Sequence, residues 1–197
     1  MKKYFKTINK IAYPVLLSAF MVFAVSCGDD DPVPPPNEEE LITTVNMVFT
    51  PQGGGSTVTF RYFDEDGADG PIAPTATGGT LAANSTYNVA MTFLNESETP
   101  TEDITAEILE EADEHQIFFA KTTALDLAFA YADVDGDGNP LGLNTIFTTG
   151  VSSSGQLTVI LRHEPDKGAT GVSTGDITNA GGETDVETTP PIEVVIQ

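Results

Sequence analysis

Oxygen-bearing side chains alternate along the segment from residue 133 to residue 139: Asp133, Asp135, Asp137 and Asn139. Alternating carboxylates interrupted by glycine bring oxygen ligands around a hard cation, as in the first half of an EF-hand loop. The twelfth position of such a loop is Asn144 instead of a bidentate Glu, so we expect a shorter calcium site. The alternative is a hairpin turn rich in Asp and Gly. The acidic segment 63–70 has looser spacing and is a second calcium candidate.

The chain contains two histidines, and both stand next to acidic residues: Glu114 precedes His115, and Glu164 follows His163. If the two segments form neighbouring strands, these four side chains supply the nitrogen and oxygen ligands that zinc or copper binds. A carboxylate can also orient a histidine as a base. The alternative is a histidine at the end of a strand that hydrogen-bonds to a carboxylate, because His163 continues an alternating apolar pattern. The sequence does not decide whether the two histidines are adjacent.

The N-terminus combines a basic start with a short apolar run. Four of the eight cations lie within the first ten residues, and residues 11–25 are mostly apolar. This run is shorter than the roughly 20 residues that span a bilayer, so residues 1–26 are predicted to be a cleaved signal peptide. The segment Ala24-Val25-Ser26-Cys27 resembles the lipobox of bacterial lipoproteins, in which the cysteine is lipid-modified. The alternative is an ordinary secretory signal with an incidental cysteine.

An acidic, proline-rich segment follows Cys27 and extends to residue 40. It contains nothing to bury, so we expect a solvated tether over residues 27–40. The run from Asp29 to Asp31 resembles the export patch of lipoproteins displayed on Gram-negative outer membranes. We therefore expect a lipid anchor in the outer membrane with the domain at the cell surface. The periplasmic face is the alternative.

Composition restricts the class of function. The chain has 30 Asp and Glu against 8 Lys and Arg, a formal net charge of −22, so we exclude nucleic acid as a partner. Beyond Cys27 there is no cysteine nucleophile, no phosphate-binding glycine loop and no H-E-x-x-H. We expect a protein that is not an enzyme.

The elements that position these residues follow from periodicity. Apolar residues alternate with polar ones from Leu41 onward, most regularly at Tyr87, Val89, Met91 and Phe93. Short alternating segments between Gly-, Asn- and Asp-rich turns predict one all-β domain over residues 41–197, an antiparallel, immunoglobulin-like β-sandwich. Residues 102–113 have both helical and strand spacing, and we favour one short helix there, followed by a strand over 116–120.

Three segments carry a resemblance to a known family: ADEHQIFF (112–119), LRHEPDK (161–167) and GDITNAGGETDVE (175–187). With the lipobox and acidic patch, they are similar to a group of small bacterial surface lipoproteins without an assigned activity. Some members are labelled as having a type 1 periplasmic binding fold. That fold alternates strands with helices, whereas strands alternate with turns here, so the residues predict the sandwich.

Together these features predict a membrane-anchored surface lipoprotein that binds an unidentified protein or small-molecule ligand, with calcium stabilising the 133–139 loop. The alternative function is binding of a transition metal by His115 and His163 with their neighbouring carboxylates.

Overall fold

The computed structural model describes residues 41–67 and 70–197. The predicted signal peptide, Cys27 and the tether lie outside the described residues, so these three predictions stay predictions. Among the described residues, no helix has the length and apolar character that crossing a bilayer requires.

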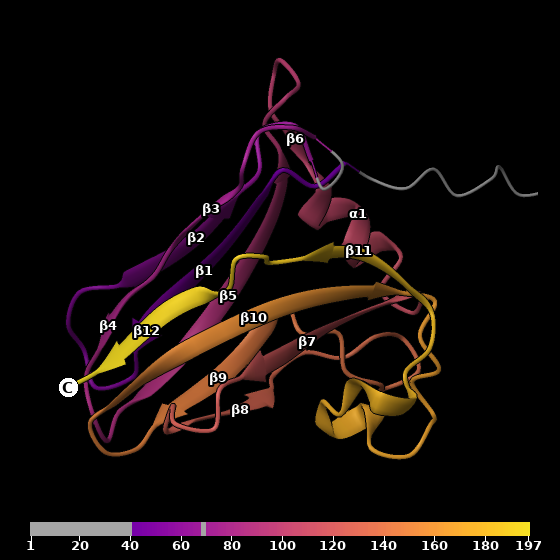
Figure 1. The fold of residues 1–197 in the computed structure, drawn as a ribbon. Coiled ribbons are helices and arrows are strands. Elements are labelled where there is room, and N and C mark those ends of the chain that lie inside the picture. Colours follow the sequence, from indigo (N-terminus) through magenta and orange to yellow (C-terminus); the bar gives the residue numbers. More distant parts are fainter. Residues whose placement is uncertain (1–40, 68–69) are drawn as a thin grey trace, which may run out of the picture. The chain divides into compact units, whose positions relative to one another are not determined.

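Two β-sheets pack face to face and confirm the all-β sandwich (Figure 1). The first sheet has the order β3 (Thr75–Thr77), β2 (Val58–Phe63), β1 (Thr44–Pro51), β5 (Thr86–Asn95), β9 (Asn144–Thr149) and β8 (Leu127–Tyr131), and β6 (Glu102–Asp103) pairs with β5. In the second sheet, β10 (Ser153–His163) is flanked on one side by β7 (His115–Lys121) and on the other by β12 (Ile192–Ile196) and β11 (Glu183–Glu187). The immunoglobulin-like strand arrangement stays a prediction.

One strand pair departs from the expected antiparallel pattern. The chain leaves the first sheet after β3 and enters the second as β4 (Gly79–Leu81), which pairs in parallel with β12. The crossing occurs at Gly78, where an added Cβ would lie 1.6 Å from the carbonyl oxygen of Glu193. Only glycine fits such a close backbone approach, so this residue allows one strand to serve both sheets.

The core lies between the sheets and follows the alternation expected from the sequence. Tyr87, Val89, Met91 and Phe93 of β5 are all buried. The ring of Phe147 on β9 makes edge contacts with Phe49 of the first sheet and Phe119 of the second, at centroid distances of 5.5 and 5.2 Å. The contact with Phe119 joins the two layers.

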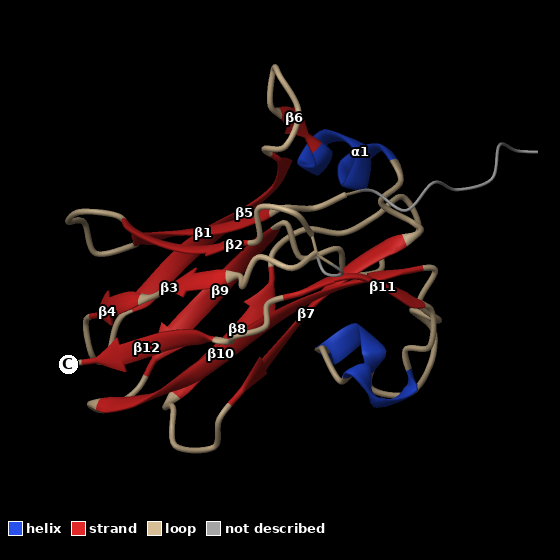
Figure 2. Cartoon of the chain, turned by 45° about the horizontal axis from the view of Figure 1, so that its top comes forward, coloured by secondary structure: helices blue, strands red, loops and turns tan. Residues whose placement is uncertain are grey.

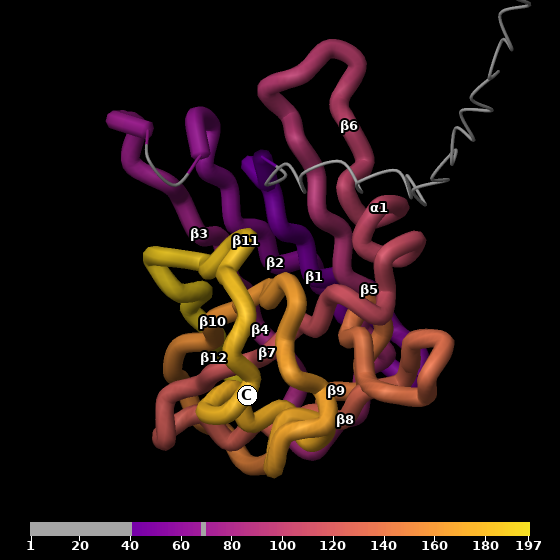
Figure 3. Tube along the Cα trace, turned by 90° about the vertical axis from the view of Figure 1, so that its right-hand side faces the viewer, coloured from indigo at the N-terminus to yellow at the C-terminus, as the bar shows by residue number. Residues whose placement is uncertain are grey.

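The predicted short helix is present as α1 (Ile104–Glu110), which leads into β7. The carboxylate of Asp103 accepts a hydrogen bond from the backbone N–H of Thr105, which caps the first turn. Ile104 and Ile108 are buried, so this face of the helix closes one end of the core. Figure 3 shows the β5–β6 hairpin projecting beyond the sheets beside this helix.

The long polar segment before β11 folds back on the outer face of the second sheet. It contains two 3-10 turns, η1 (Val172–Thr174) and η2 (Ile177–Asn179), which Figure 2 shows beside β7 and β10. Val172 packs with Phe118 and Ile160 in a small second core. This packing explains why Phe118 and Ile160 are buried although they face away from the main core.

Candidate functional site

His115 and His163 are direct cross-strand partners. His115 begins β7, His163 ends β10, and the antiparallel register of the two strands places them opposite each other. Their rings are stacked, with centroids 4.8 Å apart and planes inclined by 10°. Both residues continue the inward-facing phase of Ile117 and Leu161, and both are buried. The adjacency that the sequence left open is therefore present.

A third side chain, Asp185 of β11, completes the cluster. Leu161 pairs with Val186 and Arg162 pairs with Thr184, so Asp185 is the extra residue of a bulge between these two pairs. Bulges redirect side chains and recur beside functional sites. One carboxylate oxygen of Asp185 lies 3.6 Å from Nε2 of His115, and the other lies 4.0 Å from Nδ1 of His163. Sequence patterns do not reveal Asp185, because no spacing relates it to either histidine.

The two predicted glutamates lie at the rim of this cluster. The carboxylate of Glu114 is 3.5 Å from Nε2 of His163, and its side chain is half exposed. The backbone N–H of Glu164 donates to the carbonyl of Glu114 at 2.6 Å, which brings these two residues together. One ligand atom from each of Glu114, His163 and Glu164 lies within 4.8 Å of the others. The same holds for His115, His163 and Asp185.

The C-terminal turn of α1 sets the proton position on His115. Nδ1 of this ring lies 3.1 Å from the carbonyl oxygen of Glu111. A carbonyl only accepts hydrogen bonds, so Nδ1 carries the proton and donates it. In the neutral ring, Nε2 then holds a lone pair and faces the carboxylate of Asp185. Two acceptors that face each other at this distance are unfavourable unless a metal ion or another hydrogen-bond donor satisfies them.

The ligand atoms are close to a metal-binding arrangement but need a small rearrangement. A tetrahedral zinc ion binds N and O atoms at about 2.0–2.2 Å, which places neighbouring ligand atoms about 3.3–3.6 Å apart. The cluster His115, His163 and Asp185 spans at most 4.8 Å. Because imidazole lone pairs lie in the ring plane and the two rings are nearly parallel, one ring must turn before both nitrogens point at one ion.

The 133–139 loop has the hydrogen bonds of an Asp-rich turn. Asp133 accepts backbone N–H groups of Gly142 and Asn144 at 2.8 and 2.7 Å. One oxygen of Asp135 accepts the N–H groups of Asp137 and Asn139 at 3.0 and 2.8 Å. These bonds favour the turn interpretation, and calcium binding by Asp133, Asp135, Asp137 and Asn139 stays a prediction.

The second oxygen of Asp135 pairs with the ammonium of Lys167 at 2.8 Å, and both side chains are buried. Burial by itself raises the pKa of Asp135, but the Lys167 ammonium and the backbone N–H groups outweigh it, and the pKa is lowered. Lys167 also donates to the carbonyl of Ala112 at 2.6 Å. The pair therefore ties the loop to the segment between α1 and the histidine site.

Comparisons of the chain with family models, with curated protein sequences and with solved structures find no match in any of the three. The resemblance to bacterial surface lipoproteins stays a prediction.

Proposed function

We propose that this domain binds one divalent transition-metal ion, zinc or copper, through His115, His163 and Asp185. The single observation that carries the proposal is the pair of acceptors, Nε2 of His115 and the carboxylate of Asp185, that face each other at 3.6 Å. Two imidazoles and a carboxylate are ligands that both ions accept. The histidine alternative thus replaces the calcium-stabilised module as the leading hypothesis.

The surroundings of His115 support this assignment. Metal-binding histidines usually donate their second ring N–H to a carbonyl or carboxylate, which fixes the orientation of the ring. The carbonyl of Glu111 accepts such a bond from His115. Glu114, which is half exposed and lies beside His163, is suited to provide a fourth ligand from the rim. Because that ligand lies at the surface, the ion can enter without unfolding of the sandwich.

We further propose that the domain works outside the cytoplasm, held to the outer membrane by lipid on Cys27. The basic start, the short apolar run and the lipobox-like segment support this location. Mass spectrometry of the native protein tests it, since a polypeptide that begins at Cys27 and carries acyl chains is expected. An unacylated N-terminus, or a retained leader, contradicts the anchor.

Titration calorimetry of the purified, chelator-treated protein with Zn²⁺ and Cu²⁺ tests metal binding. We expect one ion per chain, and loss of this binding when His115→Gln and His163→Gln are combined. Asp137→Asn is the matched control, because it removes a carboxylate from the exposed turn and leaves the histidine cluster intact. Wild-type binding that persists in the double variant contradicts the proposal.

Calcium binding by the 133–139 loop is tested separately, by measuring the melting temperature with and without Ca²⁺. A cation that binds only the folded state raises the melting temperature. A melting temperature that millimolar Ca²⁺ leaves unchanged, in protein whose histidine site is empty, contradicts the predicted loop site.

A further inference from the structure

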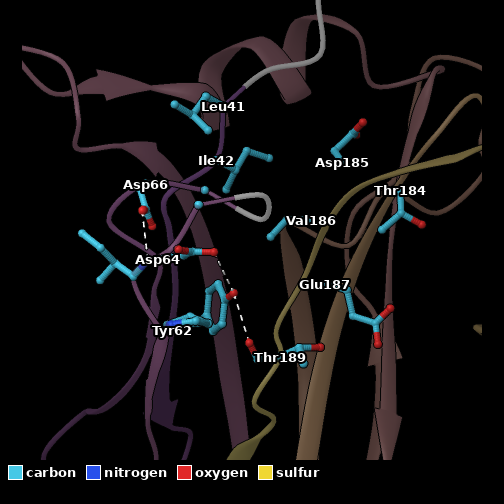
Figure 4. A pocket seen from close by; sticks show the side chains of 14 residues that line it. Leu41, Ile42, Tyr62, Asp64, Asp66, Thr184, Asp185, Val186, Glu187 and Thr189 are labelled. Atoms are coloured by element: carbon cyan, nitrogen blue, oxygen red, sulfur yellow. Dashed lines mark hydrogen bonds between the residues drawn. The ribbon is translucent and has the colours of Figure 1, made fainter.

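A pocket with a volume of about 690 Å³ opens between β2 and β11 (Figure 4). One side is formed by Tyr62 at the end of β2 and by Asp64, Asp66 and Gly67 of the segment that follows it. The other side is formed by residues of β11 and the segment after it, including Val186 and Glu187. This volume lies within the range of about 300–1,000 Å³ that is usual for small-molecule sites.

Asp64 is buried in the wall of this pocket, with 4% of its surface exposed. Its Oδ1 is buried and accepts no hydrogen bond from the described residues. Its Oδ2 lies 3.4 Å from the hydroxyl of Tyr62, which also lies 3.3 Å from the carbonyl of Thr189. That hydroxyl has one proton and cannot satisfy both acceptors. A backbone hydrogen bond from Asp66 also favours the charged carboxylate. A buried oxygen without a donor is still costly, and a ligand that donates to it recovers the lost solvation.

The charged side chains around Asp64 are all negative. Among the described residues that line the pocket there are four carboxylates and no Lys, Arg or His; the four are Asp64, Asp66, Asp185 and Glu187. Burial, and after it the charge of Asp66, raise the pKa of Asp64. Burial and the charge of Asp64 raise the pKa of Tyr62 to about 12, so its hydroxyl stays protonated at neutral pH. Such a pocket concentrates cations and repels anions.

The rest of the lining is apolar. Ile42 and Val186 are buried, whereas Leu41 and Ile72 are 43% and 47% exposed. Large apolar side chains at an open pocket provide contact area for an apolar ligand body. A bare metal ion makes no use of this apolar surface. The carboxylates and the apolar side chains together favour a ligand that has both a positive charge and a hydrocarbon part.

We infer that this pocket binds a small organic cation, a primary ammonium group on an apolar chain, with Asp64 as its counter-ion. The three N–H donors of an ammonium group match the acceptors that Asp64 and its acidic neighbours present. The apolar chain then lies against Leu41 and Ile72. The pocket shares Asp185 with the histidine cluster. The inference does not depend on metal binding, because Asp64, the carboxylate that carries it, is not part of that cluster.

Calorimetry of the full protein with hexylamine, hexanol and hexanoate, in the presence of a chelator, tests the ligand class without any substitution. The three probes share one apolar chain and differ in the head group. We expect hexylamine to bind at least about tenfold more tightly than either of the other two, since hydrogen bonds between charged groups are stronger than those between neutral groups. Equal binding of hexanol and hexylamine, or no binding of hexylamine, overturns the inference.

The Asp64→Asn substitution tests the position of the site. It keeps the size of the side chain and removes its charge, and we expect hexylamine binding to weaken by at least about tenfold. Glu98→Gln is the matched control, because it removes one negative charge from the exposed connection between β5 and β6. We expect it to leave the affinity unchanged.

Asp66→Asn provides a second test if Asp64→Asn does not fold, and we expect it to weaken binding in the same direction. Equal affinity of the wild type and the folded pocket variants overturns the assignment to this pocket. Competition by millimolar Ca²⁺ that abolishes hexylamine binding also overturns it, because the acidic loop is then a metal site. None of these results affects the zinc and copper experiment, which reports on the histidines.

Discussion

Nδ1 of His115 donates a hydrogen bond to the carbonyl oxygen of Glu111 over 3.1 Å. Because Glu111 is the C-cap of α1, the helix predicted from residues 102–113 holds a ring that lies on β7. This contact determines which nitrogen of His115 is available to an ion.

Nitrogen NMR of the imidazoles checks that consequence. At a pH where His115 is neutral, we expect its proton on Nδ1 and a large shift of the Nε2 signal when zinc is added. The chain has two histidines, so the His115→Gln spectrum assigns the signals without ambiguity. A proton on Nε2 of neutral His115 is incompatible with the proposed ligand atom.

The carboxylate of Asp185 is expected to be a metal ligand. Asp185→Asn keeps the shape of the side chain and removes its charge, so zinc affinity should fall. The loss should at least equal that of an outer-shell partner, which is about 10–100-fold. Calorimetry with Zn²⁺ measures it, and Asp137→Asn serves again as the control. Unchanged affinity in folded Asp185→Asn removes this residue from the site.

The buried pair of Asp135 and Lys167 predicts that a single and a double substitution lower the free energy of unfolding by different amounts. Lys167→Met leaves the carboxylate buried without its cation and should lower the free energy of unfolding by about 3–5 kcal/mol. Adding Asp135→Asn should recover part of this loss, since the unpaired charge is removed. Urea unfolding measures both effects, and a double variant that is less stable than Lys167→Met contradicts the argument.

The same pair predicts a pH dependence. The pKa of Asp135 is lowered in the folded state, so its contribution to stability is complete above its unfolded pKa of about 3.9. The contribution disappears as the pH falls through the lower folded pKa. The stability difference between wild type and Asp135→Asn should therefore shrink below about pH 4. Unfolding experiments at several acidic pH values measure this stability difference. A difference that grows as the pH falls contradicts the prediction.

Gly78 is expected to be irreplaceable at the crossing between the sheets. A Cβ there meets the backbone of Glu193, so Gly78→Ala should cost about 1–3 kcal/mol or more. Gly136→Ala is the matched control, because nothing lies within 4 Å of its added Cβ, and it should change stability by less than about 0.5 kcal/mol. Equal stability of the two variants would show that β3 and β4 do not cross between the sheets at this residue.

Local features of the fold could be read from the sequence. The alternation from Tyr87 to Phe93 predicted the buried face of β5, because successive residues of a strand point to opposite sides whatever lies around them. The short helix at residues 104–110 was predicted for the same kind of reason, since capping and helical spacing act within one or two turns. The predicted signal peptide and Cys27 also depend only on local order along the chain.

The candidate site depended on long-range pairing. His115 and His163 meet because the register of β7 on β10 places them opposite each other, and a shift of one residue would turn one histidine out of the core. Asp185 joins them only through a bulge opposite Leu161 and Arg162. The sequence by itself determined strands and the short helix, because these depend on neighbouring residues, whereas the export features stay predictions. The tertiary structure alone decided the cluster, because register and bulge are set by the packing of the whole sandwich.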